Sequence, residues 1–221
     1  MPSALILGAS RGLGLGLAHE FATRGWDVTG TVRKEEDRPA LEGTGAHALL
    51  CDITDPAAVV ALHSQVPAGL DLLFVNAGVI GPKHQDAGQA TAAEAGALFL
   101  TNAIAPVAAA RALLDRLAPD GVLAFMTSRM GSVALNDNGA LELYRASKAA
   151  LNSLTRSMVA KDGGARTVLT LHPGWVQTDM GGQGADLDVP TSVHGLADVI
   201  VAQRGQPGSR FLDYSGAELA W

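Results

Sequence analysis

The chain has 221 residues, of which 48% are hydrophobic and 17% are charged. Folding a chain of this size removes roughly 70% of its unfolded surface from water, so disordered and fibrous classes are excluded. The 16 Lys and Arg residues against 22 Asp and Glu give a net charge of -6, the wrong sign for a nucleic-acid partner. Cys51 is the only cysteine, which argues against a disulfide framework and predicts a reducing, cytoplasmic location.

No membrane segment is expected from the apolar stretches. No uncharged apolar run approaches the length of about 18 residues that a membrane span requires. The apolar start at residues 4–9 has no basic flank and is cut short by Arg11, so it is interpreted as a strand and not as a signal peptide.

Short apolar runs alternate with helical patterns along the chain, which is typical of a parallel sheet covered by helices. Strands are predicted at 4–7, 28–32, 46–50, 70–75, 122–126, 167–171 and 211–212. Helices are predicted from 13 to about 25 and at 56–66, 91–117, 141–161 and 191–204. We also expect a boundary or kink at Pro106, a turn at 119–121 and a helix stop at Gly163 and Gly164.

The sequence shows no linker, repeat or low-complexity segment. We therefore predict one doubly wound, Rossmann-type α/β domain over residues 1–221, with a parallel sheet of about seven strands and helices on both faces.

The first strand runs into Gly8, Gly12 and Gly14 at the start of a helix. The N–H groups of a first helical turn lack partners and the helix dipole favours an anion, so a pyrophosphate fits there. The spacing differs from the commoner G-x-G-x-x-G fingerprint. A tight turn in which glycine only relieves crowding explains the same spacing.

Two arginines indicate which dinucleotide is preferred. An NAD site places an acid at the end of the second strand, whereas a 2′-phosphate requires a cation. The second strand ends at Arg33, and Arg11 lies inside the glycine loop. This favours NADP(H), with NAD(H) as the alternative; ordinary surface arginines are the other interpretation.

Tyr144 and Lys148 lie on one face of a predicted helix. A nearby positive charge is expected to lower the pKa of the phenol from about 10 toward the useful range. Ser128 follows the fifth strand at the carboxyl edge of the sheet, where it could hold a substrate carbonyl. Taken alone, Tyr-x-x-x-Lys also occurs as an ordinary pair on an amphipathic helix.

Taken in order, these features and two short motifs resemble the short-chain dehydrogenase/reductase family over the whole chain. The two motifs are Asn76-Ala77-Gly78 and Pro173-Gly174. Within that family, residues 128–132 and 172–180 and the Trp221 ending resemble the small C-factor-type carbonyl reductases.

The resemblance implies roles for individual residues. Tyr144 would be the general acid or base, and Lys148 would lower its pKa and hold the nicotinamide ribose. Ser128 would orient the carbonyl, and Asn102 would position a proton-relay water. Besides Tyr144 and Lys148, the implied cofactor contacts are Gly8, Ser10, Arg11, Gly12, Leu13, Gly14, Arg33, Asp52, Ile53, Asn76, Ala77, Gly78, Pro173, Gly174, Val176 and Thr178.

The chain departs from the family pattern at two places. Leu7 stands where a threonine is usual, which removes a hydroxyl that could tie down the glycine loop. Residues 181–190 are short where larger relatives carry a helical lid, so we expect a mobile loop that orders on binding. His172 is interpreted as structural, and the spacing of the six histidines predicts no metal site.

The sequence thus predicts an NADP(H)-dependent oxidoreductase that interconverts a carbonyl and an alcohol on a small organic substrate. The alternative is a non-catalytic dinucleotide-binding signalling or sensor protein, which would not need Ser128, Tyr144 and Lys148 together. A sugar-nucleotide epimerase is rejected because it needs a larger C-terminal domain. A homodimer or homotetramer is expected through the helices at 102–117 and 141–161. Substrate identity and stereochemistry are left open.

Overall fold

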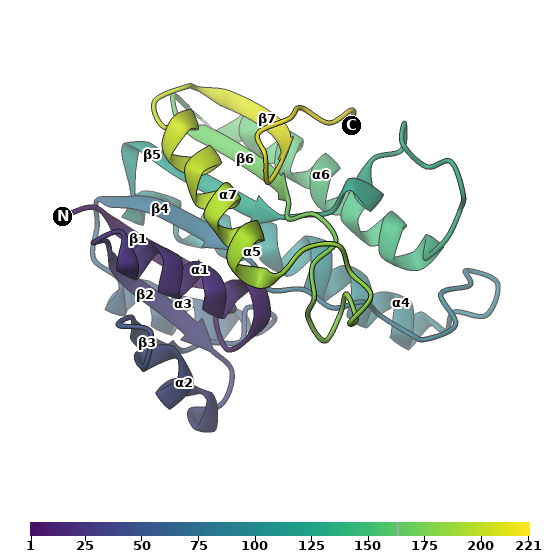
Figure 1. Cartoon of the computed structure of the whole chain (residues 1–221), viewed down its shortest axis with the longest axis horizontal. Helices are drawn as coiled ribbons and strands as arrows, with labels where there is room; N and C mark the ends of the chain where they lie inside the picture. The colour runs from purple at the N-terminus through teal and green to yellow at the C-terminus, as the bar shows by residue number, and fades with distance from the viewer. Residues whose placement is uncertain (163) are drawn as a thin grey trace.

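A parallel sheet of seven strands forms the centre of the computed structural model, which describes residues 1–162 and 164–221 (Figure 1). The strand order is β3-β2-β1-β4-β5-β6-β7. The strands are β1 (Ser3–Leu7), β2 (Asp27–Val32), β3 (His47–Leu50), β4 (Leu70–Val75), β5 (Leu117–Met126), β6 (Thr167–His172) and β7 (Gly208–Asp213). Because the order reverses between β1 and β4, the carboxyl ends of these two strands border the crevice in which ligands of such sheets bind.

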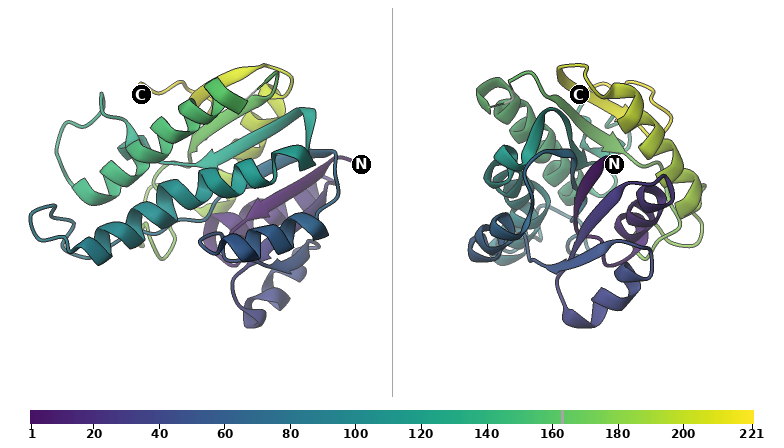
Figure 2. Two further views of the ribbon diagram at one scale, coloured as in Figure 1. Left: turned by 180° about the vertical axis from the view of Figure 1, so that it is seen from behind. Right: turned by 90° about the vertical axis from the view of Figure 1, so that its left-hand side faces the viewer.

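Helices cover both faces of the sheet, as two further views of the molecule show (Figure 2). One face carries α1 (Gly12–Thr23), α2 (Arg38–Glu42) and α7 (Val189–Gln203). The other face carries α3 (Pro56–Gln65), α5 (Ala105–Ala112) and α6 (Glu142–Asp162), and α4 (Ala92–Phe99) extends from α5 beyond the sheet. The short turns of helix are η1 (Glu35–Asp37), η2 (Leu100–Ile104), η3 (Leu114–Arg116) and η4 (Arg129–Gly131).

The apolar runs form strands because both of their faces are buried. Along β1, Ala4 and Ile6 pack into the core under α1 and α7, whereas Leu5 and Leu7 pack into the core under α3, α5 and α6. Successive side chains of a strand point to opposite faces, so a strand between two helical layers must be apolar throughout. The predicted fold class is confirmed.

Each predicted strand is present, but the start of β5 was predicted wrongly. β5 begins at Leu117 and not at residue 122, and the predicted helix over 91–117 ends at Ala112. Leu70 pairs with Leu117 and Leu72 pairs with Val122, so the predicted turn at 119–121 is a bulge inside the strand. The short helix α2 was not predicted.

The helix over 92–112 contains a wide turn at η2. Its start is a capping box between Thr91 and Glu94. The N–H of Ala105 donates to the carbonyl of Leu100, five residues earlier, which is the bond of a π-helical turn. Pro106 has no N–H and crowds the preceding turn, so the expected irregularity at this proline takes the form of a π turn instead of a break.

By length and composition alone, the helix over 92–112 could cross a membrane, and it is the one such helix among the described residues. The sequence does not predict it as a membrane span, because Glu94 and Arg111 lie near the two ends of the helix and interrupt the uncharged run. Its second half packs against the sheet through Val107, Ala109 and Ala110, as a core helix does.

The C-terminal end of α6 agrees with the prediction as far as the structure describes it. The helix ends at Asp162. The predicted stop at Gly163 lies outside the described residues, whereas Gly164 has a φ of +57°, the left-handed conformation that follows many helices.

Candidate active site

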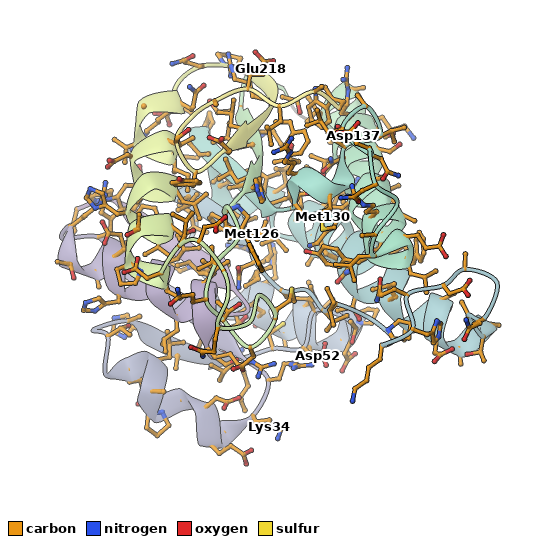
Figure 3. All side chains as sticks on the ribbon, turned by 45° about the vertical axis from the view of Figure 1, so that its right-hand side comes forward. Lys34, Asp52, Met126, Met130, Asp137 and Glu218 are labelled. Carbon is orange, nitrogen blue, oxygen red and sulfur yellow. The ribbon has the colours of Figure 1, made fainter. Side chains whose placement is uncertain are left out.

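A cleft of about 440 Å³ opens at the carboxyl edge of the sheet, where the strand order reverses. Asp52 and Met126 both line it, and Figure 3 labels these two residues on the ribbon. The predicted site residues that line the cleft are Gly8, Ser10, Arg11, Gly12, Leu13, Arg33, Asp52, Ile53, Asn76, Ala77, Gly78, Tyr144, Lys148, Pro173 and Thr178. The fold thus brings segments from both halves of the chain to one surface.

The glycine loop needs glycine for steric reasons. Gly8 and Gly12 have φ values of +88° and +53°, which L side chains rarely adopt. A Cβ on Gly14 would lie 2.1 Å from the carbonyl oxygen of Gly8, so only glycine lets α1 start this close to the loop. Asn76 Nδ2 donates to the same Gly8 oxygen over 2.6 Å and so ties the loop to the end of β4.

A threonine hydroxyl supports the loop from a different strand than expected. The N–H of Gly8 donates to Oγ1 of Thr31 over 3.0 Å, and Thr31 is only 1% exposed. Leu7, at the position where the family has threonine, is fully buried in the core. The hydroxyl that the sequence lacks at Leu7 is therefore supplied by Thr31 at the end of β2.

The end of the cleft at β2 is cationic. Arg33 follows β2 and is exposed, and its charge also acts on Asp52. Partial burial raises the pKa of Asp52, but hydrogen bonds from Thr54 and the Arg33 charge hold it below its usual value. Arg11 extends across the cleft to Asp179, with 2.7 Å between Nη1 and Oδ2, and both side chains are more than 70% exposed. The exposed guanidinium of Arg33 at this end of the cleft suits a phosphate group, and Arg11 is a second exposed guanidinium that lines the cleft.

The catalytic candidates lie on the opposite wall, in the first turns of α6. Tyr144 and Lys148 are both buried and line the cleft. The ammonium of Lys148 donates to the carbonyl oxygen of Met126 over 3.0 Å and lies 5.9 Å from the centre of the Tyr144 ring. Ser128 does not line the cleft, but its side chain lies close enough to the Tyr144 phenol to lower the pKa of that phenol. The three side chains therefore form one group.

Burial sets the protonation of this group. It raises the pKa of Tyr144 to about 12, which the Ser128 hydrogen bond only partly offsets, and it lowers the pKa of Lys148 to about 8. The expected lowering of the Tyr144 pKa is thus wrong for the protein alone, because desolvation disfavours the phenolate more than the Ser128 hydrogen bond favours it. The phenol holds its proton at neutral pH, as a general acid must.

Asn102 lies in the wide turn η2 and is fully buried beneath the cleft. Its amide accepts from the N–H of Val79 over 2.8 Å and donates to the Val79 carbonyl over 2.7 Å. It also donates to Ser147 Oγ, which in turn donates to the carbonyl of Tyr144. Asn102 therefore braces the segment after β4 against α6, and its role toward a relay water stays a prediction.

The family model of the short chain dehydrogenases matches residues 2–186. The chain belongs to this family. The C-signal protein of Myxococcus xanthus is 44% identical over 156 residues, which cover 69% of this chain and 93% of that protein. A carbonyl reductase from Pseudomonas aeruginosa superposes with a TM-score of 0.93 at 41% identity over 100% of both chains. A short-chain dehydrogenase/reductase from Burkholderia multivorans, solved with bound NADP, superposes with a TM-score of 0.95 at 39% identity over 100% of this chain and 99% of that one.

Three of the contacts that the short-chain dehydrogenase pattern implies do not reach the cleft surface: Gly14, Gly174 and Val176. Gly174 has a φ of +82°, and a Cβ there would lie 2.4 Å from Leu187. Val176 is buried and pairs with Leu187 through an isolated bridge. The structure thus gives these residues a part in folding the glycine loop and the segment after β6.

The short segment after β6 is held by its own hydrogen bonds. The indole N–H of Trp175 donates to the carbonyl of Gly181 over 2.8 Å, and the Gln177 amide donates to the carbonyl of Ala185. Ordering of residues 181–190 on binding stays a prediction. His172 does not line the cleft, and burial lowers its pKa to about 4, so the ring is neutral at physiological pH.

Sequence reasoning missed several residues of this short-chain dehydrogenase site. Val79, Thr101, Gln177, Asp179 and Met180 also line the cleft. Each lies next to, or within a few residues of, a motif or site residue that the sequence did identify. The signal that could have identified them was their position beside a recognised motif at the carboxyl end of a strand.

Proposed function

We propose that this chain is an NADP(H)-dependent carbonyl reductase acting on a small organic substrate. The observation that carries the proposal is a single cleft in which Tyr144 and Lys148 face the glycine loop and two arginines. A bound nicotinamide dinucleotide would supply the hydride, and the cleft would place it beside the phenol. Residues 1–221 would act as one domain, since both walls of the cleft are needed.

The chain's own residues would hold the dinucleotide along the cleft. The glycine loop would take the pyrophosphate on its free N–H groups. Arg33 and Arg11 would take the 2′-phosphate, because the tip of β2 offers a cation and no acid. Pro173 and Thr178 would border the nicotinamide, and NAD(H) would bind more weakly for want of the phosphate contact.

The proton steps would belong to α6 and the end of β5. The Tyr144 phenol would give its proton to the carbonyl oxygen as the hydride arrives at carbon, which makes the alcohol. Ser128 would orient the carbonyl, and Lys148 would stabilise the phenolate left behind and fix the nicotinamide ribose. Asn102 would hold a water through which the proton is replaced.

The test has two parts. Titration of the purified protein with NADPH and NADH, by nucleotide fluorescence, should show tighter NADPH binding, and Arg33→Ala should weaken NADPH at least ~10-fold and NADH by under ~2-fold. Tyr144→Phe should bind NADPH normally and lose about 10²-fold or more of carbonyl reduction. Absence of binding to either nucleotide would overturn the proposal.

A signalling or sensor role is the second candidate, and the 44% identity to the C-signal of Myxococcus xanthus favours it. Such a protein would use the dinucleotide as a ligand. It would bind NADPH as tightly as the enzyme but reduce no carbonyl, and Tyr144→Phe would change nothing measurable. The grouping of Ser128, Tyr144 and Lys148 supports the enzyme.

We also propose a cytoplasmic homodimer or homotetramer that pairs through the outer faces of η2, α5 and α6. Leu100 and Ile104 are 40% and 54% exposed on this surface, and Leu154 of α6 is 37% exposed. Burying such side chains would favour association. A monomer mass in light scattering at micromolar concentration would overturn this part. The single thiol, Cys51, is buried, which fits a reducing compartment.

A further inference from the structure

One polar side chain is buried in the loop that joins β4 to α4. Gln85 is 7% exposed, whereas its neighbours Lys83, His84 and Ala87 are exposed. Its backbone has a φ of +55°, a conformation that costs a residue with a Cβ about 1–3 kcal/mol unless the surroundings hold it. Placing this side chain therefore costs the loop some stability.

The carboxamide of Gln85 has partners at both ends. Nε2 donates to the carbonyl of Ile80 over 2.9 Å and to the carbonyl of Pro82 over 2.7 Å. Oε1 accepts from the N–H of Tyr144 over 3.0 Å, in a buried hydrogen bond across 59 residues of sequence. Only an uncharged amide can donate twice and accept once in this arrangement.

The N–H of Tyr144 is one of those that a helix cannot satisfy internally. Tyr144 lies in the first turn of α6, which begins at Glu142. The preceding Leu141 has a φ of +56°, far from the extended backbone of an ordinary N-cap residue. Gln85 thus supplies from another loop what a local cap usually supplies. The Glu142 carboxylate, which accepts from the N–H of Ala87, makes a second link between this loop and α6.

We propose that Gln85 is a positioning residue for the proton transfer by Tyr144, an inference that rests on the proposed function. Gln85 fixes the main chain of Tyr144 from one side, and Ser147 and Asn102 fix it from the other. Proton transfer needs donor and acceptor within about 2.6–3.2 Å, and a displacement of about 1 Å costs roughly 10²-fold in rate. Loss of the Gln85 bond should therefore lower turnover and leave the cofactor site unchanged.

The first test compares Gln85→Leu with Gln89→Leu. The first change keeps the volume and removes the three hydrogen bonds; the second alters an exposed glutamine of the same loop whose side chain bonds to Asp86. We expect Gln85→Leu to lower kcat about 10–100-fold with KM and the NADPH Kd within about 2–3-fold, and Gln89→Leu to match the wild type. Equal losses in the two variants, or a kcat within about twofold of wild type in folded Gln85→Leu, would overturn the proposal.

Gln85→Glu provides a signature that a merely structural role would not give. An ionised carboxylate at this position would face the carbonyls of Ile80 and Pro82, whereas the neutral acid could donate to one of them and still accept from Tyr144. The ratio of kcat in this variant to that of wild type should therefore rise as pH falls from about 8 to about 5.5. A ratio independent of pH would contradict the proposal, and this variant serves even if Gln85→Leu does not fold.

Hydrogen exchange separates this inference from the proposed function. The amide of Tyr144 should exchange at least ~10-fold faster in Gln85→Leu or Gln85→Glu than in wild type, whether or not any carbonyl is reduced. If the exchange rate changes but wild type reduces no carbonyl, the proposed function is wrong, whereas the hydrogen bond between Gln85 and the Tyr144 N–H is confirmed. If the exchange rate is unchanged, the positioning role itself is wrong.

Discussion

The two walls of the cleft are built by different means. The glycine-loop wall consists of main chain that approaches closely because Gly8 and Gly14 carry no side chain, while Gly12 has a φ of +53° that L side chains rarely adopt. The α6 wall consists of buried polar side chains, Tyr144 and Lys148 foremost, and other segments hold it through hydrogen bonds to the Tyr144 main chain and to the Lys148 ammonium. The glycine-loop wall therefore depends on missing side chains, and the α6 wall depends on hydrogen-bond partners.

This difference predicts how each wall fails. Adding a single carbon at Gly8 or Gly14 should damage the glycine-loop wall, because neither position has room for it, whatever the chemistry of the added group. Removing a hydrogen-bonding group should damage the α6 wall, because a buried donor or acceptor then loses its partner. The following substitutions test the contrast, beginning with the largest expected effect.

Gly14→Ala should lower the free energy of unfolding by about 3 kcal/mol and abolish tight NADPH binding. The new Cβ would lie 2.1 Å from the Gly8 oxygen and 2.6 Å from Asn76 Nδ2, so α1 and the loop must separate. Urea unfolding and nucleotide titration measure the two effects. The matched control is Gly96→Ala in α4, where nothing lies within 4 Å of the new Cβ; it should stabilise by about 0.5–1 kcal/mol. A Gly14→Ala protein as stable as wild type would mean that the loop adjusts freely.

Lys148→Met should change how stability depends on pH. Lys148 has a pKa of about 8 in the fold against an ordinary value of 10.5, so between these pH values the unfolded chain binds one more proton. The free energy of unfolding therefore rises with pH from about 8 to about 10 in wild type, by on the order of 2 kcal/mol, and the variant lacks this rise.

Urea unfolding at each pH gives the difference in the free energy of unfolding between wild type and Lys148→Met. This difference isolates the contribution of Lys148, because groups such as Cys51 titrate alike in both proteins. Above a pH of about 10 the sign reverses for Tyr144, whose raised pKa of about 12 makes the fold lose stability as pH rises. A pH-independent difference from about pH 8 to about pH 10 would show that Lys148 is not desolvated.

Thr31→Val should have the smallest effect, because one hydrogen bond is lost and the shape is kept. The partly buried N–H of Gly8 loses its acceptor, which should cost about 1 kcal/mol of stability and weaken NADPH binding about 5-fold. Thr29→Val, two residues earlier in β2, is the control for the loss of a hydroxyl. Equal effects of the two changes on NADPH affinity would show that Thr31 does not support the loop.

The strands were predictable because burial on both faces leaves an apolar run between turn residues, as in Leu70–Val75. The start of β5 was not predictable, because the same residue types occur in a turn and in a bulge. Pro119, Asp120 and Gly121 are compatible with either structure. Only the pairing with β4 decides between them.

The site was predictable where a residue type is demanded by local geometry. Glycines at a strand end and a Tyr-x-x-x-Lys pair are recognisable within a few residues of sequence. Thr31 and Gln85 act on partners 23 and 59 residues away, so no local pattern identifies them. The pKa of Tyr144 was misjudged for the same reason, since burial depends on the whole fold.

The wide turn at Leu100–Ile104 also divides one long helix into α4 and α5, which have different neighbours. A π turn holds an extra residue, so the faces of α4 are rotated relative to those of α5 by about 100° from where a regular helix would put them. α5 can keep its packing on the sheet while α4, beside the loop that carries Gln85, turns independently. Gaining or losing one residue in this turn would therefore rotate α4 without rebuilding the half of the helix that supports the sheet.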